Sequence, residues 1–248
     1  VFQQYAATQP DLNLMAFVTQ IIPTRVLEHP SQRTIQYHPS LLPKHRGRSA
    51  INHAILQGDA ETGLTIFWVD EGIDTGPILL QKRVPIGEND TLNSLYRDHL
   101  FPLGIEALAE AVRLIAGGNA PRDPQDESEA TREPPWEGDI AQIDWFWPAR
   151  KVHNFIRGSD RQPGAWTTIN GVRVRLYGSR IASANAGSNG SIVAVDHNGL
   201  TVRCGDGHAV LVDTVRPDGG ERGPATEWAA GAKVRSGAQC ERVEVEES

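Results

Sequence analysis

The chain of 248 residues has few cysteines, no long apolar run and no excess of positive charge. Its two cysteines, Cys204 and Cys240, are too few for a disulfide framework or a cysteine-rich zinc site. No apolar stretch approaches the roughly 20 residues needed to cross a bilayer, and no basic-then-apolar leader opens the sequence. These features predict a cytoplasmic protein in a reducing environment, with no membrane partner.

The charge balance is acidic, with 31 Asp and Glu residues against 24 Lys and Arg residues and a formal net charge of −7. A protein that binds a phosphate backbone over a broad surface usually has the opposite balance. The composition therefore disfavours a nucleic-acid partner but does not exclude one. With 39% hydrophobic residues, the chain can build one large or two ordinary cores.

The first half of the chain alternates short apolar runs with helical patterns. Strands are predicted at 11–18, 34–38, 64–69 and 78–85, and helices at 1–8, 23–27, 50–57 and 91–116. This alternation predicts a mostly parallel sheet in an α/β domain over residues 1–118.

The second half has a different character. Residues 119–139 contain four prolines among acidic and small polar residues, which predicts a linker. A helix is predicted at 148–158, and short strands at 172–177, 191–195, 200–203 and 209–215. These strands, separated by Gly and Asn, predict a small antiparallel β-barrel domain over 140–240, followed by an acidic tail at 241–248.

Two ionisable residues are candidates for acid–base chemistry. His38 closes a predicted strand beside a stiff Pro-Ser-Leu-Leu-Pro loop, and ligands of open α/β sheets bind at such strand ends. Asp74 lies in a glycine-bounded loop, where a turn-capping role is the simpler interpretation. Paired with His38, its carboxylate can orient the imidazole and stabilise the imidazolium, which defines a minimal general acid–base unit.

Gln36 is the third candidate. Residues two apart on a strand point to the same face, so Gln36 and His38 are predicted to share one pocket, with Tyr37 facing away. The Gln36 amide is a candidate donor to the oxygen of a carbonyl under attack. A purely structural glutamine is an equal alternative.

Three stretches carry a resemblance to a known family: YHPSLLPKHRG at 37–47, FWVDEGIDTG at 67–76 and RGSDRQPGAW at 157–166. They resemble enzymes that move a formyl group from 10-formyltetrahydrofolate. The similarity is greatest to the formyltransferase/hydrolase domains of 10-formyltetrahydrofolate dehydrogenases, and methionyl-tRNA formyltransferases are more distant. The family usually has Asn two residues before the histidine, where this chain has Gln36.

The resemblance implies a Rossmann-like formyltransferase domain followed by a small, OB-like β-barrel. Its N-terminal glycine-containing strand–helix half has no counterpart before Val1, so the chain is expected to be N-terminally incomplete. His38 and Asp74 take the family's catalytic roles by this match. The folate is expected along two segments, comprising Met15, Ala16 and Phe17, and Val69, Asp70, Glu71, Gly72 and Ile73.

The implied reaction is formyl transfer from 10-formyltetrahydrofolate, a small-molecule donor, to an amine, without a metal. The acceptor is open between a small amine, water and an aminoacyl-tRNA, and the oligomeric state is also open. Hydrolysis of the donor to tetrahydrofolate and formate is one alternative. A catalytically silent binding module is another, although the presence of both His38 and Asp74 opposes it.

Overall fold

The computed structural model describes residues 1–16, 18, 20–184 and 186–242. The chain forms two compact units that are discontinuous in sequence. The first contains 1–54, 60–86 and 94–135, and the second contains 55–59, 87–93 and the described residues from Trp136 onward.

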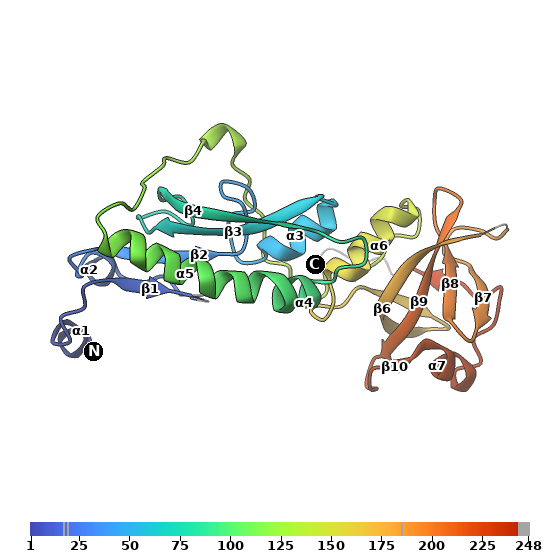
Figure 1. Cartoon of the computed structure of the whole chain (residues 1–248). Helices are drawn as coiled ribbons and strands as arrows, with labels where there is room; N and C mark the ends of the chain where they lie inside the picture. The colour runs from blue at the N-terminus through green and yellow to red at the C-terminus, as the bar shows by residue number, and fades with distance from the viewer. Residues whose placement is uncertain (17, 19, 185, 243–248) are drawn as a thin grey trace. The chain divides into compact units, whose positions relative to one another are not determined.

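The first unit is built on a four-stranded sheet (Figure 1). Its strands, in spatial order, are β1 (Asn13–Met15), β2 (Thr34–His38), β3 (Glu61–Trp68) and β4 (Ile78–Pro85). Only β1 and β2 are parallel, while β3 is antiparallel to both of its neighbours, so the prediction of a mostly parallel sheet is wrong. The connection from β3 to β4, residues 69–77, is shorter than the dozen residues that a parallel crossover requires.

Helical segments precede, connect and follow the strands of this sheet in sequence. They are α1 (Phe2–Ala6), α2 (Thr24–Leu27), α3 (Ala50–Gln57), α4 (Leu92–Ser94), a π-helix (Leu95–Leu100), α5 (Phe101–Ala116) and a 3-10 helix (Glu127–Glu129). None of the helices among the described residues has the length and apolar character needed to cross a membrane.

The long helix predicted at 91–116 is interrupted by the π-helix that precedes α5. Pro102, in the first turn of α5, lacks the N–H that a continuous α-helix would donate to the carbonyl four residues earlier. The π-helix ends just before Pro102, so the proline lies in the first turn of α5. The absence of its N–H costs least there, because the first N–H groups of an α-helix have no partner within the helix.

Strand β1 is shorter than the predicted strand at 11–18 and is not fully buried. It pairs only with β2 among the described strands, and the Leu14 side chain is 44% exposed. β2, by contrast, lies between two strands and has four of its five residues buried.

Helix α5 packs tightly on the face of the sheet that carries Tyr37. A Cβ atom on Gly104 would lie 2.9 Å from the Tyr37 ring, so the helix backbone approaches β2 at a point where no side chain fits. Tyr37 belongs to the hydrophobic core of the first unit, with Ile35, Leu64, Ile66, Trp68, Leu79, Ala107, Ala111 and Ile115.

The segment predicted as a linker is divided in the structure, because its residues up to Pro135 belong to the first unit. The Trp68 indole donates to the Pro121 carbonyl over 2.7 Å, and Asp123 forms a β-bridge with Ile78. This part of the predicted linker is therefore bound to the first unit and is not a free linker.

The second unit is a curled, antiparallel sheet with two helices (Figure 1). The strand order is β11-β5-β6-β9-β8-β7, with β10 paired to β9. A bridge between Ser191 and Gln239 links the residues before β7 to those before β11, so the two ends of this order meet. The elements are α6 (Ala149–Gly158), β5 (Trp166–Ile169), β6 (Val172–Ser183), β7 (Ile192–Asp196), β8 (Gly199–Arg203), β9 (His208–Pro217), β10 (Gly223–Pro224), α7 (Ala225–Gly231) and β11 (Cys240–Glu241).

All four strands predicted in this half are present, and β6 and β9 are longer than predicted. The curled sheet agrees with the expected barrel, whereas its OB-like character remains a prediction. Glu241 pairs within β11 and therefore does not belong to a free tail, and residues 243–248 lie outside the described residues.

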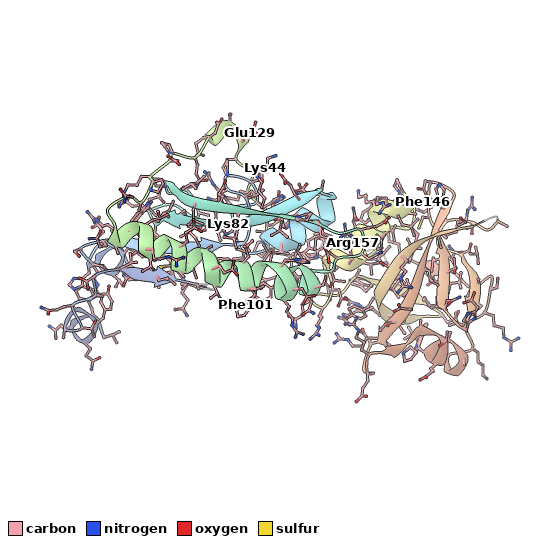
Figure 2. The ribbon with its side chains drawn as sticks, in the orientation of Figure 1. Lys44, Lys82, Phe101, Glu129, Phe146 and Arg157 are labelled. Atoms are coloured by element: carbon pink, nitrogen blue, oxygen red, sulfur yellow. The ribbon has the colours of Figure 1, made fainter. Side chains whose placement is uncertain are left out.

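Helix α6 anchors residues 87–93, one of the two short segments that join the second unit from earlier in the chain. The buried Arg157 guanidinium donates to the Gly87 carbonyl over 3.2 Å and to the Asp90 carbonyl over 2.8 Å. His153 lies 3.0 Å from the Glu88 carbonyl through Nε2. Figure 2 labels Arg157 on this helix.

Replacing a helical glycine by alanine usually stabilises a protein, but the contact between Gly104 and Tyr37 predicts the opposite at this position. Gly104→Ala in α5 is expected to lower the free energy of unfolding by about 1–2 kcal/mol, because the clash exceeds the usual helix gain. Gly231→Ala in α7, with open space around its Cβ position, is expected to raise it by about 0.5–1 kcal/mol. Urea unfolding of both variants checks this pair, and a Gly104→Ala protein at least as stable as the parent would contradict it.

Candidate active site

Strand β2 presents two of the predicted catalytic residues on one face. Gln36 and His38 point to the face opposite Tyr37, as the period of two predicts. The His38 side chain is nearly fully buried, at 4% exposure. Met15 on β1 is the register partner of Gln36, so the end of β1 lies beside this site.

The loop between β3 and β4 brings Asp74 back over β2. Asp74 has a φ of +57°, in the left-handed region that Asp tolerates better than most residues. A Cβ atom on Gly76 would lie 1.7 Å from the Trp68 carbonyl oxygen, so only glycine allows the loop to return this closely. Asp70 stabilises the turn by accepting hydrogen bonds from the Gly72 amide, at 3.0 Å, and the Thr75 hydroxyl, at 2.7 Å.

The carboxylate of Asp74 meets both β2 side chains. Its Oδ2 atom accepts from the Gly47 amide over 2.8 Å and lies 3.6 Å from His38 Nδ1. Its Oδ1 atom lies 3.5 Å from Gln36 Nε2. Of the three residues predicted as catalytic from the sequence, Gln36 and His38 therefore both lie against the buried carboxylate of the third, Asp74.

The protonation of the His38 ring follows from its partners. Nε2 lies 2.8 Å from the His45 carbonyl, which can only accept, so Nε2 carries the hydrogen of the neutral ring. Nδ1 then presents a lone pair toward Asp74. Burial lowers the pKa of His38, against the opposing effect of the Asp74 charge and of the His45 carbonyl. The lowered pKa favours the neutral imidazole, with its lone pair on Nδ1.

The loop after His38 is fixed by two polar side chains from β3 and β4. The Thr65 hydroxyl donates to the Ser40 carbonyl over 2.7 Å and accepts from the Leu42 amide over 3.1 Å. The Gln81 amide donates to the Leu42 carbonyl over 2.8 Å and to Thr65 Oγ1 over 2.9 Å. This network holds the chain that carries the His45 carbonyl to its position over His38.

Gln125 is a site residue that the sequence did not predict. Its amide nitrogen donates to the carbonyls of Asp74, at 2.9 Å, and Gly76, at 2.8 Å. Its amide oxygen accepts from the Arg46 guanidinium, which also binds Glu127. A lone glutamine in a proline-rich and acidic segment has no sequence pattern that would have identified it.

A second unpredicted group lies behind the His45 carbonyl. Glu133 lies between two buried histidines, with its carboxylate oxygens 3.6 Å from His45 Nδ1 and 3.7 Å from His53 Nδ1. The other ring nitrogen of His53 lies 2.9 Å from the Pro134 carbonyl. Across the described part of the chain, no cluster of three or more His, Cys, Asp or Glu residues has an arrangement that could hold a metal ion.

The residues predicted to contact folate border this site. Met15 and Val69 are half-buried, whereas Ala16 and residues 70–73 are exposed, with Ile73 at 50%. The Val69 amide donates to the Thr34 carbonyl over 3.0 Å, which fixes the start of the loop against β2. Phe17 lies outside the described residues. Binding by this set stays a prediction.

Family comparisons identify both parts of the chain. Residues 1–112 match the formyl transferase family, and residues 138–233 match the formyl transferase C-terminal domain. The chain belongs to the formyl transferase family, and the resemblance inferred from the sequence motifs is confirmed.

Two kinds of relative represent this family. Mitochondrial 10-formyltetrahydrofolate dehydrogenase of Mus musculus is 43% identical over 236 residues, which cover 92% of this chain and 26% of the relative. Methionyl-tRNA formyltransferase of Trichlorobacter lovleyi is 37% identical over 237 residues, covering 96% of this chain and 74% of the relative. The chain thus spans about a quarter of the length of the dehydrogenases it matches.

Solved structures share the fold. HypX from Aquifex aeolicus, crystallised with tetrahydrofolic acid, superposes with a TM-score of 0.73 at 25% identity, over 91% of this chain and 40% of HypX. Methionyl-tRNA formyltransferase from Clostridium thermocellum has a TM-score of 0.55 at 20% identity, over 75% of this chain and 78% of that protein, and supports the fold alone.

The geometry predicts the direction in which Asp74 affects the titration of His38. Asp74→Asn is expected to lower the pKa of the His38 imidazole further, because the charge that raises it is removed while the burial remains. NMR titration of the imidazole signals measures the shift. Glu71→Gln, an exposed change in the same loop, serves as control and should leave the titration unchanged. A His38 pKa that rises in Asp74→Asn would contradict the assignment.

Proposed function

We propose that this chain catalyses transfer of the formyl group of 10-formyltetrahydrofolate to a nucleophile. The carrying observation is the buried pair of His38 and Asp74, in which a basic Nδ1 lies 3.6 Å from a carboxylate oxygen. Membership of the formyl transferase family supports this use of the pair. A silent binding module would have no need to bury such a pair, since burial of ionisable groups is costly.

His38 acts as the general base. The nucleophile attacks the formyl carbon and gives its proton to His38 Nδ1, and Asp74 stabilises the resulting imidazolium. Collapse of the tetrahedral intermediate breaks the bond from the formyl carbon to N10 of the folate. The proton on His38 passes to N10, so the products are tetrahydrofolate and the formylated acceptor.

Gln36 supplies a hydrogen-bond donor to the developing oxyanion. A carboxamide nitrogen carries two hydrogens, and the 3.5 Å contact with Asp74 Oδ1 directs one of them at the carboxylate. The second is then oriented across the same face of β2 as His38. This use of Gln36 gives the longer side chain the place that Asn usually has in the family.

The folate is proposed to lie along the end of β1 and the 69–73 loop. Backbone carbonyls of the exposed residues Asp70, Glu71 and Gly72 can pair with the amide-like edge of a pterin, while Met15 and Ile73 cover its faces. Tetrahydrofolic acid in the Aquifex aeolicus HypX structure supports a folate on this fold.

The acceptor is proposed to be an amine. His38 Nδ1 and Asp74 Oδ2 are both acceptors at neutral pH, and 3.6 Å between them suits a bridging donor with two hydrogens. A primary amine meets this requirement, but so does water, which makes hydrolysis the second candidate. The net charge of −7 disfavours an aminoacyl-tRNA, although one relative is a methionyl-tRNA formyltransferase.

The role of His38 as a base fixes the sign of the pH dependence. Single-turnover formyl release by the protein should rise as pH increases through the His38 pKa, which lies below its usual value. It should level off above that pKa, because the neutral ring is the reactive form. A rate that falls over this range would show that the imidazolium is required and would overturn the assignment.

Product analysis separates the two reactions. With a panel of small amines and donor in excess, formylated amine is expected to form faster than free formate. Formate release that is unchanged by any amine would select hydrolysis instead.

Gln36 is tested by removing its donor without changing its size greatly. Gln36→Leu should slow single-turnover formyl release by about 100- to 1,000-fold, the usual effect of losing one oxyanion donor. Gln36→Asn keeps the amide and should retain most of the rate. If Gln36→Leu reacts as fast as the parent, the side chain is structural and does not contact the oxyanion.

A further inference from the structure

We propose that Gln125 is a positioning residue that sets the Asp74 carboxylate against His38, an inference that rests on the proposed function of this pair. Gln125 does not touch the Asp74 side chain. It binds the Asp74 backbone, which must hold a left-handed conformation for the carboxylate to reach β2.

The hydrogen-bonding capacity of the Gln125 side chain is fully used. Both amide hydrogens go to loop carbonyls, those of Asp74 and Gly76, at 2.9 and 2.8 Å. The amide oxygen accepts from Arg46 Nη2 at 2.8 Å and from Arg46 Nε at 3.2 Å. Four partners fix a planar group in one orientation, so the side chain is locked on both sides.

Arg46 is itself anchored. Its guanidinium is 6% exposed and makes a second pair of hydrogen bonds with the Glu127 carboxylate, at 2.9 and 2.7 Å. Such bidentate, charge-assisted pairs are the strong ones among hydrogen bonds. Gln125 is therefore attached to a buried side chain of the His38 loop, which is itself paired with the exposed Glu127 carboxylate.

These contacts close a ring around the catalytic carboxylate. The Arg46 side chain reaches the Asp74 backbone through Gln125, while the backbone of the next residue, Gly47, donates to Asp74 Oδ2 at 2.8 Å. Two consecutive residues, Arg46 and Gly47, thus fix Asp74: Arg46 acts on its backbone through Gln125, and Gly47 binds its side chain directly. If Gln125 loses its donors, the backbone half of the ring opens and the distance from Asp74 to His38 is no longer fixed.

Two variants separate the donors of Gln125 from its acceptor. Gln125→Glu keeps oxygens for Arg46 but has nothing to donate to Asp74 and Gly76, whereas Gln125→Met loses both functions at similar length. Glu129→Gln, an exposed change on the 3-10 helix of the same segment, is the matched control (Figure 2).

Both variants are expected to speed hydrogen exchange of the Gly47 amide by about tenfold, since its bond to Asp74 Oδ2 is weakened. Both should also slow single-turnover formyl release by about 100-fold with little change in KM, as expected for a misplaced catalytic group. Glu129→Gln should match the parent in each measurement. A Gln125→Glu protein that keeps the parent's exchange and rate would overturn the proposal, because Gln125 would then serve only to bind Arg46.

The exchange measurement needs no substrate, so it distinguishes this inference from the proposed function. If the Gly47 amide responds but the parent releases no formyl group, the positioning stands and the function fails. If neither variant folds, hydrogen exchange is measured in the parent protein. The Gln125 side-chain hydrogens should then exchange slowly, because both are hydrogen-bonded. Exchange at the rate of a free carboxamide would overturn the proposal.

Discussion

One buried negative charge, the carboxylate of Asp74, determines how the chain around it is arranged. A carboxylate taken from water loses far more solvation energy than a single hydrogen bond returns, so it must be met by several donors. Here the Gly47 amide and the Gln36 carboxamide donate to it from two separate segments, and the His38 ring, 3.6 Å away, can donate to it only when protonated. The β3–β4 loop, the His38 loop and the 119–135 segment all take shapes that serve this one group.

Strand β2 joins this charge to the hydrophobic core. Its side chains alternate between two faces: Tyr37 packs against α5, and Gln36 and His38 lie near Asp74 on the opposite face. The approach of Gly104 to the Tyr37 ring leaves no space between the strand and the helix at this point. Rigid packing on one face is thus transmitted over a single residue to the geometry of the reactive groups on the other.

That His38, Asp74 and Gln36 lie together could be predicted from the sequence, because strand alternation and two short motifs indicate it. The direction of β3 could not, since an α/β pattern of elements does not state how each connection turns. The interruption of the long helix near Pro102 could have been predicted, because proline has no N–H to donate within a continuous helix.

The segment at 119–135 was the larger difficulty. Its composition is that of a linker, and its order comes from hydrogen bonds to backbone carbonyls of distant loops, as with Gln125 and Asp74. Such bonds depend on where the loops lie and leave no periodic pattern in the sequence. Composition predicts whether a segment can form its own core, but it does not predict whether another core will hold it.

The interleaving of the two units has a consequence for how this chain can be rearranged. Residues 55–59 and 87–93 belong with the later part of the chain, and Arg157 occupies the carbonyls of Gly87 and Asp90. A recombination event, or an engineer, that exchanged everything after residue 135 for another sequence would leave those carbonyls facing an unrelated surface. A substitute for the later part must therefore bring a donor equivalent to Arg157, or the carbonyls of Gly87 and Asp90 lose the guanidinium that binds them.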